Sequence, residues 1–497
     1  MKMHPISDRI RGGNCTVLGY GVSNRPLVDW LIAHGAGSVT VRDKRSLADM
    51  EQCGDKARLE ACGATLICGE EYLKGLGGDV IFRSPGIRPD LPELTAAMEA
   101  GGVLTSEMEL FLALTEATVV AISGSDGKTT STTLTSLMLT EACKRRGIGK
   151  VYLGGNIGTP LLPLVEEMTS EDFAVVELSS FQLMTMGEGA GIVRGALTNV
   201  TPNHLNWHVD MEEYIAAKTH LLSGSPEAAV LNARDENTRR IGATLPCPVV
   251  WFTGERDLPS GFLPDVLQTR RGDVAVYERQ GSILTVAPTE NGVTETSVLD
   301  VSRIRVPGRH NVENFMTAIG LTLPYVTPAD VQAVADAFTG VAHRLELVRE
   351  IPREGGAIRF YNSSIDSSPT RSLAALSAME ETNRALHRRP PTVICGGQDK
   401  HIPFDPLAVG LCRMAASVIL TGEARGQIMD ALRACPDFDP EKLPVTVIPD
   451  YREAMKFACE SAADGDTVLL SPACTSFDAF KNFEERGEVF REIVKGI

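Results

Sequence analysis

Several features that mark particular classes of protein are scarce or missing in this sequence. Basic residues are outnumbered, with 48 Lys and Arg against 64 Asp and Glu, for a formal net charge of −16. Nucleic acids and anionic membranes attract clustered positive charge, so we expect neither as the main partner. Every apolar run is shorter than the roughly 20 residues needed to cross a bilayer, so no membrane-spanning segment is predicted.

Paired cysteines are also lacking. The 11 cysteines are an odd number, with no Cys-x-x-Cys pair and no His/Cys cluster at metal-ligand spacing. This pattern argues against a disulfide framework or a structural zinc site, and it predicts reduced thiols in a cytoplasmic protein. Residues Met1 to Pro5 are not followed by the apolar core of a signal peptide, so we expect no secretion.

The most informative stretch that is present is Gly124-Ser125-Asp126-Gly127-Lys128-Thr129-Thr130. It follows a short β-branched run at 118–123 and precedes residues 131–139, whose apolar positions have helical spacing. A strand, a glycine loop and a helix N-terminus in this order turn backbone N–H groups toward a phosphate. Lys128 would reach the β- and γ-phosphates and the Thr129 hydroxyl would contact Mg²⁺, so ATP binding is predicted.

The length of 497 residues predicts about three domains, all of the α/β class. Near the N-terminus, a strand at 15–18 leads into a Gly19-Tyr20-Gly21 turn, a helix, and a second strand that ends at Asp43. This order resembles a dinucleotide fingerprint, although Asn24 takes the third glycine position. A tight turn in any α/β domain is the alternative, and it stays open. Either way, we predict a small Rossmann-like domain.

The central part carries candidate metal and base contacts. Glu177 ends an apolar strand, where a nucleotide-bound Mg²⁺ would find an oxygen ligand, although strand-terminal glutamates also occur for structural reasons. His204 and His208 lie in a polar turn and are either metal-site groups or histidines with satisfied ring nitrogens. Asn311 and Asn314 are three residues apart on a helix face and could meet a base edge or cap the helix. Residues 249–298 are expected to form antiparallel, peripheral strands.

The C-terminal part begins a third α/β pattern near Gly340. Strands are predicted at 358–361, 393–395, 418–420, 445–448 and 468–470, alternating with helices. Polar turns follow three of these strands, and ligands gather at strand ends in such folds. We therefore predict three domains: a Rossmann-like domain at 1–112, a P-loop ATPase-like mononucleotide-binding domain at 113–340, and a Rossmann-like domain at 341–497.

Taken together, these motifs resemble those of the Mur ligases of bacterial peptidoglycan synthesis. The resemblance covers essentially the whole chain, in order. Its motifs are 124–130, 154–158, 177–182, 199–204, Lys218, 310–311, 343–344 and 471–487. The last stretch, S-P-A-C-T-S-F-D-A-F-K-N-F-E-E-R-G, is similar to the branch of the family that adds D-glutamate.

This resemblance implies a role for each matching position. It assigns nucleotide binding to Gly124, Gly127, Lys128, Thr129, Thr130, Asn311, Asn314 and Arg344. It assigns two Mg²⁺ positions to Thr129, Glu177, His204 and a carbamylated Lys218. The expected catalytic residues are Lys128, Glu177, His204 and Lys218. It assigns the UDP-sugar to Ser23, Asp43, Arg45, Ser84 and Asn156. It assigns the D-glutamate carboxylates to Lys400, Ser476 and Phe483, with Ser367 and Phe477 as further substrate contacts.

The resemblance also implies a reaction. ATP would activate UDP-N-acetylmuramoyl-L-alanine as an acyl phosphate, which the amine of D-glutamate attacks, in a cytoplasmic and monomeric enzyme. Asp126, Asn203, Asn206 and Ile365 depart from the family pattern, and Ile365 replaces an expected lysine. Two alternatives remain: a related amide ligase resembling folylpolyglutamate synthase, and a nucleotide-binding regulator without ligase activity. Composition alone would make Lys218 a solvated face residue of its helix.

Overall fold

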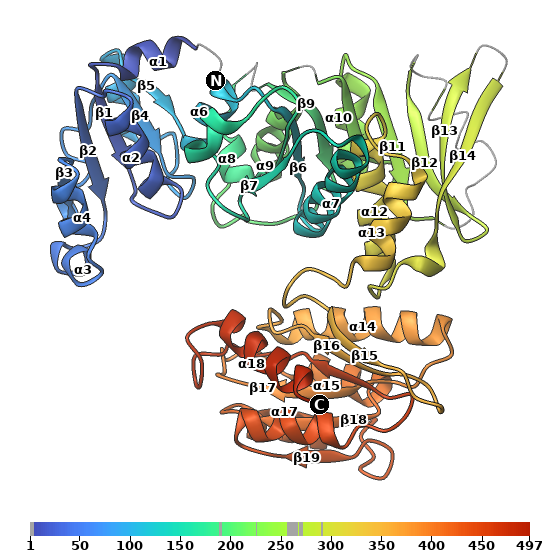
Figure 1. Cartoon of the computed structure of the whole chain (residues 1–497). Helices are drawn as coiled ribbons and strands as arrows, with labels where there is room; N and C mark the ends of the chain where they lie inside the picture. Colours follow the sequence, from blue (N-terminus) through green and yellow to red (C-terminus); the bar gives the residue numbers. More distant parts are fainter. Residues whose placement is uncertain (1–3, 188–190, 225, 256–266, 268–271, 290–291) are drawn as a thin grey trace. The chain divides into compact units, whose positions relative to one another are not determined.

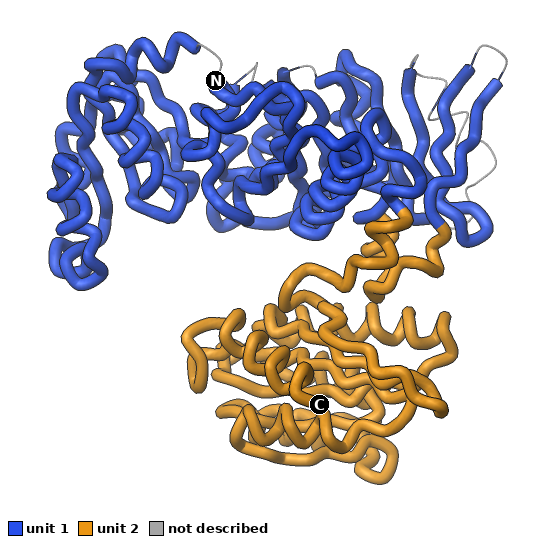
Figure 2. The backbone as a smooth tube through the Cα atoms, viewed as in Figure 1, with its two compact units in different colours: residues 1–299, 314–331 blue, residues 300–313, 332–497 orange. Residues whose placement is uncertain are grey.

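The structure is a computed structural model that describes residues 4–187, 191–224, 226–255, 267, 272–289 and 292–497. Within these ranges the chain forms three sheets flanked by helices, so the predicted α/β class is confirmed (Figure 1). Its contacts define two compact units, one of residues 1–299 and 314–331 and the other of 300–313 and 332–497 (Figure 2). The domain boundaries at 112/113 and 340/341 remain a prediction.

The first sheet, five-stranded in the described residues, has the order β3-β2-β1-β4-β5 and is parallel throughout. Its strands are β1 (Asn14–Leu18), β2 (Ser38–Asp43), β3 (Thr65–Cys68), β4 (Val80–Arg83) and β5 (Val103–Thr105). Its helices are α1 (Pro5–Ile10), α2 (Asn24–Ala33), α3 (Leu47–Gln52), α4 (Asp55–Ala61), α5 (Pro92–Glu99) and α6 (Glu107–Leu114). The chain runs from β1 to β3 on one side and returns to β4 on the other. The crevice at this reversal, between the ends of β1 and β4, is where such sheets bind ligands.

The second sheet has nine strands in the described ranges, in the order β14-β13-β12-β11-β10-β9-β6-β8-β7. They are β6 (Thr118–Ser123), β7 (Val151–Gly155), β8 (Phe173–Glu177), β9 (Ile192–Leu197), β10 (Ala228–Asn232), β11 (Val249–Thr253), β12 (Val274–Arg279), β13 (Ser282–Thr289) and β14 (Gly292–Asp300). The accompanying helices are α7 (Lys128–Arg146), α8 (Ser180–Leu183), α9 (Met211–Thr219), α10 (Glu236–Thr244), α12 (Arg309–Thr322) and α13 (Pro328–Ala337). Because β6 lies between β8 and β9, the loop that follows it sits at the reversal of strand order.

One expectation for this sheet was wrong. Strand β11 pairs in parallel with both β10 and β12, whereas residues 249–298 were expected to be antiparallel throughout. The antiparallel arrangement holds for β12 with β13. Residues 256–266, 268–271 and 290–291 of that segment lie outside the described residues. Single-sequence patterning missed the parallel pairing because a short apolar run is compatible with either strand direction.

The third sheet has six strands in residues 346–470, all of which the structure describes, in the order β15-β16-β20-β17-β18-β19. They are β15 (Glu346–Ile351), β16 (Ile358–Asn362), β17 (Thr392–Gly396), β18 (Ser417–Thr421), β19 (Val445–Val447) and β20 (Thr467–Leu470). The helices are α14 (Pro369–Ala385), α15 (Asp405–Met414), α16 (Arg425–Ala434), α17 (Tyr451–Glu460) and α18 (Phe483–Lys495). Two buried clusters cover the two faces, one including Leu376 and Leu407 and the other Met455 and Phe490. All five predicted strands of this part are confirmed.

The first two sheets share one hydrophobic cluster, which extends from Ile10 through Phe111 to Val249. Residues at the end of the first sheet can therefore touch those of the second inside the same unit. Among the residues that the structure describes, no helix is both long and apolar enough to traverse a bilayer.

Candidate active site

The loop between β6 and α7 has the geometry of a phosphate cradle. Gly124 and Gly127 have φ angles of +145° and +79°, which favour glycine. A Cβ would lie 1.9 Å from Thr198 Oγ1 at Gly124 and 2.4 Å from Asn314 Oδ1 at Gly127. Both positions therefore require glycine, and the backbone is left open to a ligand.

Asp126 of this loop and the predicted base-contact residues Asn311 and Asn314 have defined surroundings. Asp126, an acid in a loop that would hold an anion, is exposed, and Asn199 Oδ1 accepts its backbone N–H at 2.9 Å. Asn314, a predicted base contact, accepts a hydrogen bond at Oδ1 from Ser131 Oγ at 3.2 Å and lies close to Gly127 of the loop. The Asn311 amide donates to Pro307 O at 2.6 Å, as a helix-terminal side chain does.

Two lysines converge on one carbonyl of the loop. Lys128 Nζ donates to Gly124 O at 2.9 Å and to Ser125 O at 2.7 Å. Lys218 Nζ, from α9, donates to the same Gly124 O at 2.8 Å and to Ser123 Oγ at 3.3 Å. Lys218 is only 1% exposed, so the expectation of a solvated lysine is wrong. Burial, and then the charge of Lys128, lower the pKa of Lys218 to about 7.

Glu177 ends β8 with one carboxylate oxygen unused. Asn156 Nδ2, in the turn after β7, donates to Glu177 Oε1 at 2.8 Å. Glu177 Oε2 is buried, and among the described residues it has no hydrogen-bond partner. A buried, unpaired carboxylate oxygen is costly unless a cation completes it, so this position fits a divalent ion.

The two histidines of the turn after β9 have different surroundings. His204 is exposed, has a φ of +56°, and its ring centroid lies 4.9 Å from that of Phe181. Partial desolvation of the ring, and then the charges of Lys128 and Lys218, lower the pKa of His204, which leaves a neutral imidazole available as a ligand. His208 is buried, with Nε2 2.9 Å from Ser180 Oγ and Nδ1 3.2 Å from Glu213 Oε2. Its ring nitrogens are thus satisfied.

The oxygen and nitrogen donors around the loop are few. In the described part of the chain, no three His, Cys, Asp or Glu side chains gather at metal distance. Mg²⁺ typically keeps several waters and binds one or two carboxylates together with phosphate oxygens. Glu177, the Thr129 hydroxyl and His204 therefore fit Mg²⁺ held largely by a nucleotide, and they do not fit an all-protein metal site.

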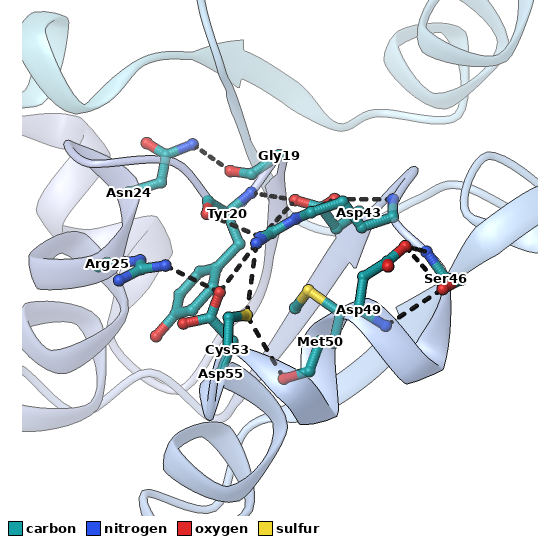
Figure 3. A network of polar contacts seen from close by, with 11 residues as sticks. Gly19, Tyr20, Asn24, Arg25, Asp43, Ser46, Asp49, Met50, Cys53 and Asp55 are labelled. Carbon is teal, nitrogen blue, oxygen red and sulfur yellow. Dashed lines mark hydrogen bonds and ion pairs between the residues drawn. The ribbon is translucent and has the colours of Figure 1, made fainter. Parts of the chain in front are cut away.

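At the end of the first sheet, a charged network orders the Gly19–Gly21 turn (Figure 3). Asp43 accepts the backbone N–H of Tyr20 at 2.7 Å and Arg45 Nε at 3.0 Å. Burial alone would raise the pKa of Asp43, but these hydrogen bonds hold it below its ordinary value. Buried Asp55 accepts from Arg25 at 2.9 Å and from Arg45 at 3.0 Å.

Three more residues complete this end of the sheet. Asn24, which stands at the third glycine position, donates from Nδ2 to Gly19 O at 2.8 Å. Ser84 packs so closely that a Cβ on Gly19 would lie 2.7 Å from Ser84 Cβ. Ser23 precedes α2 without a capping hydrogen bond from its side chain among the described residues. The structure therefore brings Ser84, Asp43 and Arg45 to one end of this sheet, at or next to the Gly19–Gly21 turn. The sequence did not predict that Asp55 belongs to this network, because it lies 12 residues after Asp43 and outside the strand–turn–helix motif.

The second unit holds the remaining predicted residues on loops at strand ends. Arg486, fully buried, donates from Nε to Ser364 Oγ at 3.0 Å and from Nη1 to Thr475 O at 3.1 Å. Ser364 Oγ in turn donates to Phe483 O at 2.7 Å. These bonds join the loop after β16 to the loop after β20 and the start of α18. Sequence reasoning missed Arg486 because nothing local marks an arginine on a helix as buried.

The predicted substrate contacts of this unit differ in exposure. Ser476 is buried, whereas Phe477 is 63% exposed. Lys400 and Arg344 are exposed, and Ser367 and Phe483 are half-buried. Ile365, at the expected lysine position, is half-buried, and its carbonyl accepts from Arg371 Nη1 at 3.3 Å. Of these predicted contacts, Lys400 and Arg344 are thus exposed cations and Ser476 is a buried hydroxyl.

The fold and the loop at 124–130 define an α/β protein of the nucleotide-binding class. Comparison with known proteins narrows the class. The family model for the Mur ligase middle domain matches residues 122–322, and the model for the Mur ligase, glutamate ligase domain matches residues 343–474. The chain belongs to the Mur ligase family.

Individual relatives are similar over the whole length. The chain is 37% identical to UDP-N-acetylmuramoylalanine--D-glutamate ligase of Ruminiclostridium cellulolyticum, over 100% of this chain and 99% of that protein. It is 38% identical to the protein of the same name from Acetivibrio thermocellus, with the same coverage. Among solved structures, UDP-N-acetylmuramate-alanine ligase from Thermotoga maritima covers 97% of this chain and is itself 99% covered, at a TM-score of 0.52 and 18% identity. That structure supports the fold alone.

Proposed function

We propose that this Mur ligase uses ATP to join D-glutamate to UDP-N-acetylmuramoyl-L-alanine, a step of peptidoglycan precursor synthesis. The observation that carries the proposal is the convergence of Lys128 and Lys218 on Gly124 O in the phosphate loop. The full-length relatives named for D-glutamate addition support this choice of substrates.

The proposed reaction has two steps, phosphoryl transfer followed by amide-bond formation. The terminal carboxylate of the alanyl group attacks the γ-phosphorus of ATP, the bond to the β-phosphate oxygen breaks, and ADP leaves. The D-glutamate nitrogen then attacks the acyl carbon, the carbon–oxygen bond to phosphate breaks, and the amine loses a proton. Lys128 and the loop N–H groups neutralise charge that develops on the transferring phosphoryl group, so their contribution is electrostatic and positional.

Magnesium would supply charge neutralisation on the phosphate oxygens. We assign Thr129 and Glu177 to one position, and His204 with a carbamate of Lys218 to a second. The carbamate forms when the neutral Lys218 amine attacks CO₂ and loses a proton. The buried amine, with its pKa near 7 and a second lysine on the same carbonyl, supports this assignment.

Substrate positions follow the two sets of strand ends. We assign the UDP-sugar to Ser23, Asp43, Arg45, Ser84 and Asn156. We assign D-glutamate to Ser367, Lys400, Ser476, Phe477 and Phe483, and the nucleotide also to Asn311, Asn314 and Arg344. The chain carries every one of these residues itself, which supports a monomer, and we propose a cytoplasmic location because the reaction needs ATP.

Phosphate release from purified protein tests the reaction. ATP, UDP-N-acetylmuramoyl-L-alanine and D-glutamate together should release phosphate, and omission of any one should abolish the release. L-glutamate is the matched control substrate. Release that depends on a folate substrate instead would favour the folylpolyglutamate synthase-like alternative. Phosphate release that depends on neither the UDP-sugar nor the amino acid would favour a regulatory ATPase and overturn the proposal.

A further inference from the structure

Hydrogen bonds connect the segment after β4 to the segment that carries His204, and Arg88 donates most of them. Arg88 donates from Nη2 to Glu213 Oε1 at 2.9 Å and from Nη1 to Glu213 Oε2 at 3.2 Å. Its Nη1 also donates to Trp207 O at 2.7 Å. The guanidinium therefore holds one side chain and one backbone carbonyl of the same segment, with the fork geometry that favours bidentate carboxylate binding.

Glu213 passes this contact on to the turn that contains His204. Its Oε2 lies 3.2 Å from His208 Nδ1 and accepts the backbone N–H of Val209 at 2.9 Å. His208 Nε2 lies 2.9 Å from Ser180 Oγ, and Ser180 is the first residue of α8, the short helix after Glu177. Glu213 also stands in the first turn of α9, and Lys218 is on the same helix. One carboxylate thus links Arg88 to the elements that present three of the predicted catalytic residues.

Aromatic contacts follow the same path. The guanidinium carbon of Arg88 lies 5.1 Å from the centroid of the Trp207 ring, and Trp207 Nε1 donates to Gly86 O at 3.3 Å. Trp207 packs on Phe181 at 4.5 Å, and Phe181 packs on His204 at 4.9 Å between ring centroids. The Arg88 and Glu213 side chains are each only 22% exposed. Water and salt therefore screen this ion pair less than a fully exposed one, and its geometry is better fixed.

We propose that Arg88 is a positioning residue, which fixes the His204 turn and the start of α9 from the segment that follows Ser84. This inference rests on the proposed function for its role in the reaction. The His204 ring is itself exposed, on a left-handed backbone, so its placement depends on the groups that hold the turn. The Arg88 segment begins at a predicted UDP-sugar residue, so the same side chain ties the sugar end of the unit to the metal end.

A matched control exists in the same unit. Arg145 donates from Nε to Asp330 at 3.0 and 3.2 Å and from Nη2 to Tyr325 O at 3.1 Å, so it also binds a carboxylate and a carbonyl far away in sequence. Arg88 differs in one respect, because its Nε and Nη2 also donate to the two oxygens of Asp90, each at 2.8 Å. Its partners lie on α13 and in the turn before it, away from the His204 turn. Arg145→Ala therefore removes a structural arginine contact of the same unit that does not involve the His204 turn.

The experiment compares Arg88→Ala, Arg88→Lys and Arg145→Ala in the full chain. Arg88→Ala should lower kcat about 10- to 100-fold, as loss of a group that orients a metal ligand does, with KM for D-glutamate changed less than about 3-fold. Arg88→Lys keeps the positive charge but loses the bidentate guanidinium geometry, so its kcat should lie between those of Arg88→Ala and the wild type. Millimolar guanidinium should partly restore Arg88→Ala. Arg145→Ala should lower Tm similarly and leave kcat unchanged.

Hydrogen exchange of the ligand-free protein gives a readout that does not depend on activity. Backbone amides of residues 201–213 should exchange faster in Arg88→Ala than in the wild type, and should be unchanged in Arg145→Ala. Equal exchange in both variants, or a kcat loss that is the same for both, would overturn the inference. If the wild type releases no substrate-dependent phosphate, the proposed function fails, while the exchange comparison still decides whether Arg88 holds the turn.

Discussion

Lys128 and Lys218 donate hydrogen bonds to the same carbonyl oxygen, that of Gly124, at 2.9 and 2.8 Å. Two ammonium groups on one acceptor repel each other, and one of them is almost fully buried. The arrangement favours loss of the Lys218 charge, either as a neutral amine or by modification. The two lysines therefore have different tasks, although both lie at the phosphate loop.

Removal of Lys128 tests the phosphate loop. Lys128→Ala should lower kcat at least on the order of 10²–10³-fold, because it deletes a transition-state charge and no core volume. Tm should stay within a few degrees of the wild type. Lys144→Ala, which removes an exposed lysine paired with Glu141 on the same helix, is the control and should leave both unchanged. Near-normal turnover in Lys128→Ala would mean that ATP binds elsewhere.

Lys218 should be essential because its carbamate supplies an anionic oxygen ligand. Lys218→Ala is expected to be almost inactive, and acetate or formate should restore part of the rate by supplying an oxygen ligand. Lys218→Arg should resist this rescue, since the guanidinium fills the site with fixed positive charge. Carbon-13 NMR after ¹³CO₂ labelling should give one carbamate signal that is lost in Lys218→Ala. Persistence of that signal in the variant, or none in the wild type, would contradict the assignment.

Lys400 tests the amino-acid site of the second unit. If it binds a D-glutamate carboxylate, Lys400→Ala should raise KM for D-glutamate about 10- to 100-fold, the equivalent of roughly 1.4–2.7 kcal/mol. KM for ATP should change less than about 3-fold in the same variant. A collapse of ATP affinity instead would place Lys400 in the nucleotide site. Lys442→Ala, which removes an exposed lysine of the same unit, serves as the control.

Glu107 should make stability depend on pH. Burial raises the pKa of Glu107 from 4.5 to about 7, so the folded protein keeps this proton where the unfolded chain releases it. Its contribution to the free energy of unfolding is complete below pH 4.5 and is lost as the pH rises to about 7. Glu107→Gln should remove this slope, a difference of about 3 kcal/mol between pH 5 and pH 8 in urea denaturation. Exposed Glu99→Gln should keep the wild-type slope.

Much of this architecture could be predicted from local patterns. Short runs of apolar residues and glycines predict the strands of the third sheet and the loop at 124–130. Such runs determine local structure through contacts between residues that are close in sequence. The pairs Arg88–Glu213 and Arg486–Ser364 are 125 and 122 residues apart in sequence, and no local property of either partner indicates the other. The parallel pairing of β11 was missed for the same reason, since strand direction is set by distant partners.

The bonds of Arg486 have a consequence for how the second unit meets its ligand. Because a buried guanidinium ties the loops after β16 and β20 together during folding, the conformational entropy of these loops is lost then, before any amino acid arrives. Association therefore needs to immobilise mainly the ligand itself. For the proposed D-glutamate site, loops preorganised in this way would give a tight complex from few contacts, and the affinity would depend on Arg486, which is fully buried.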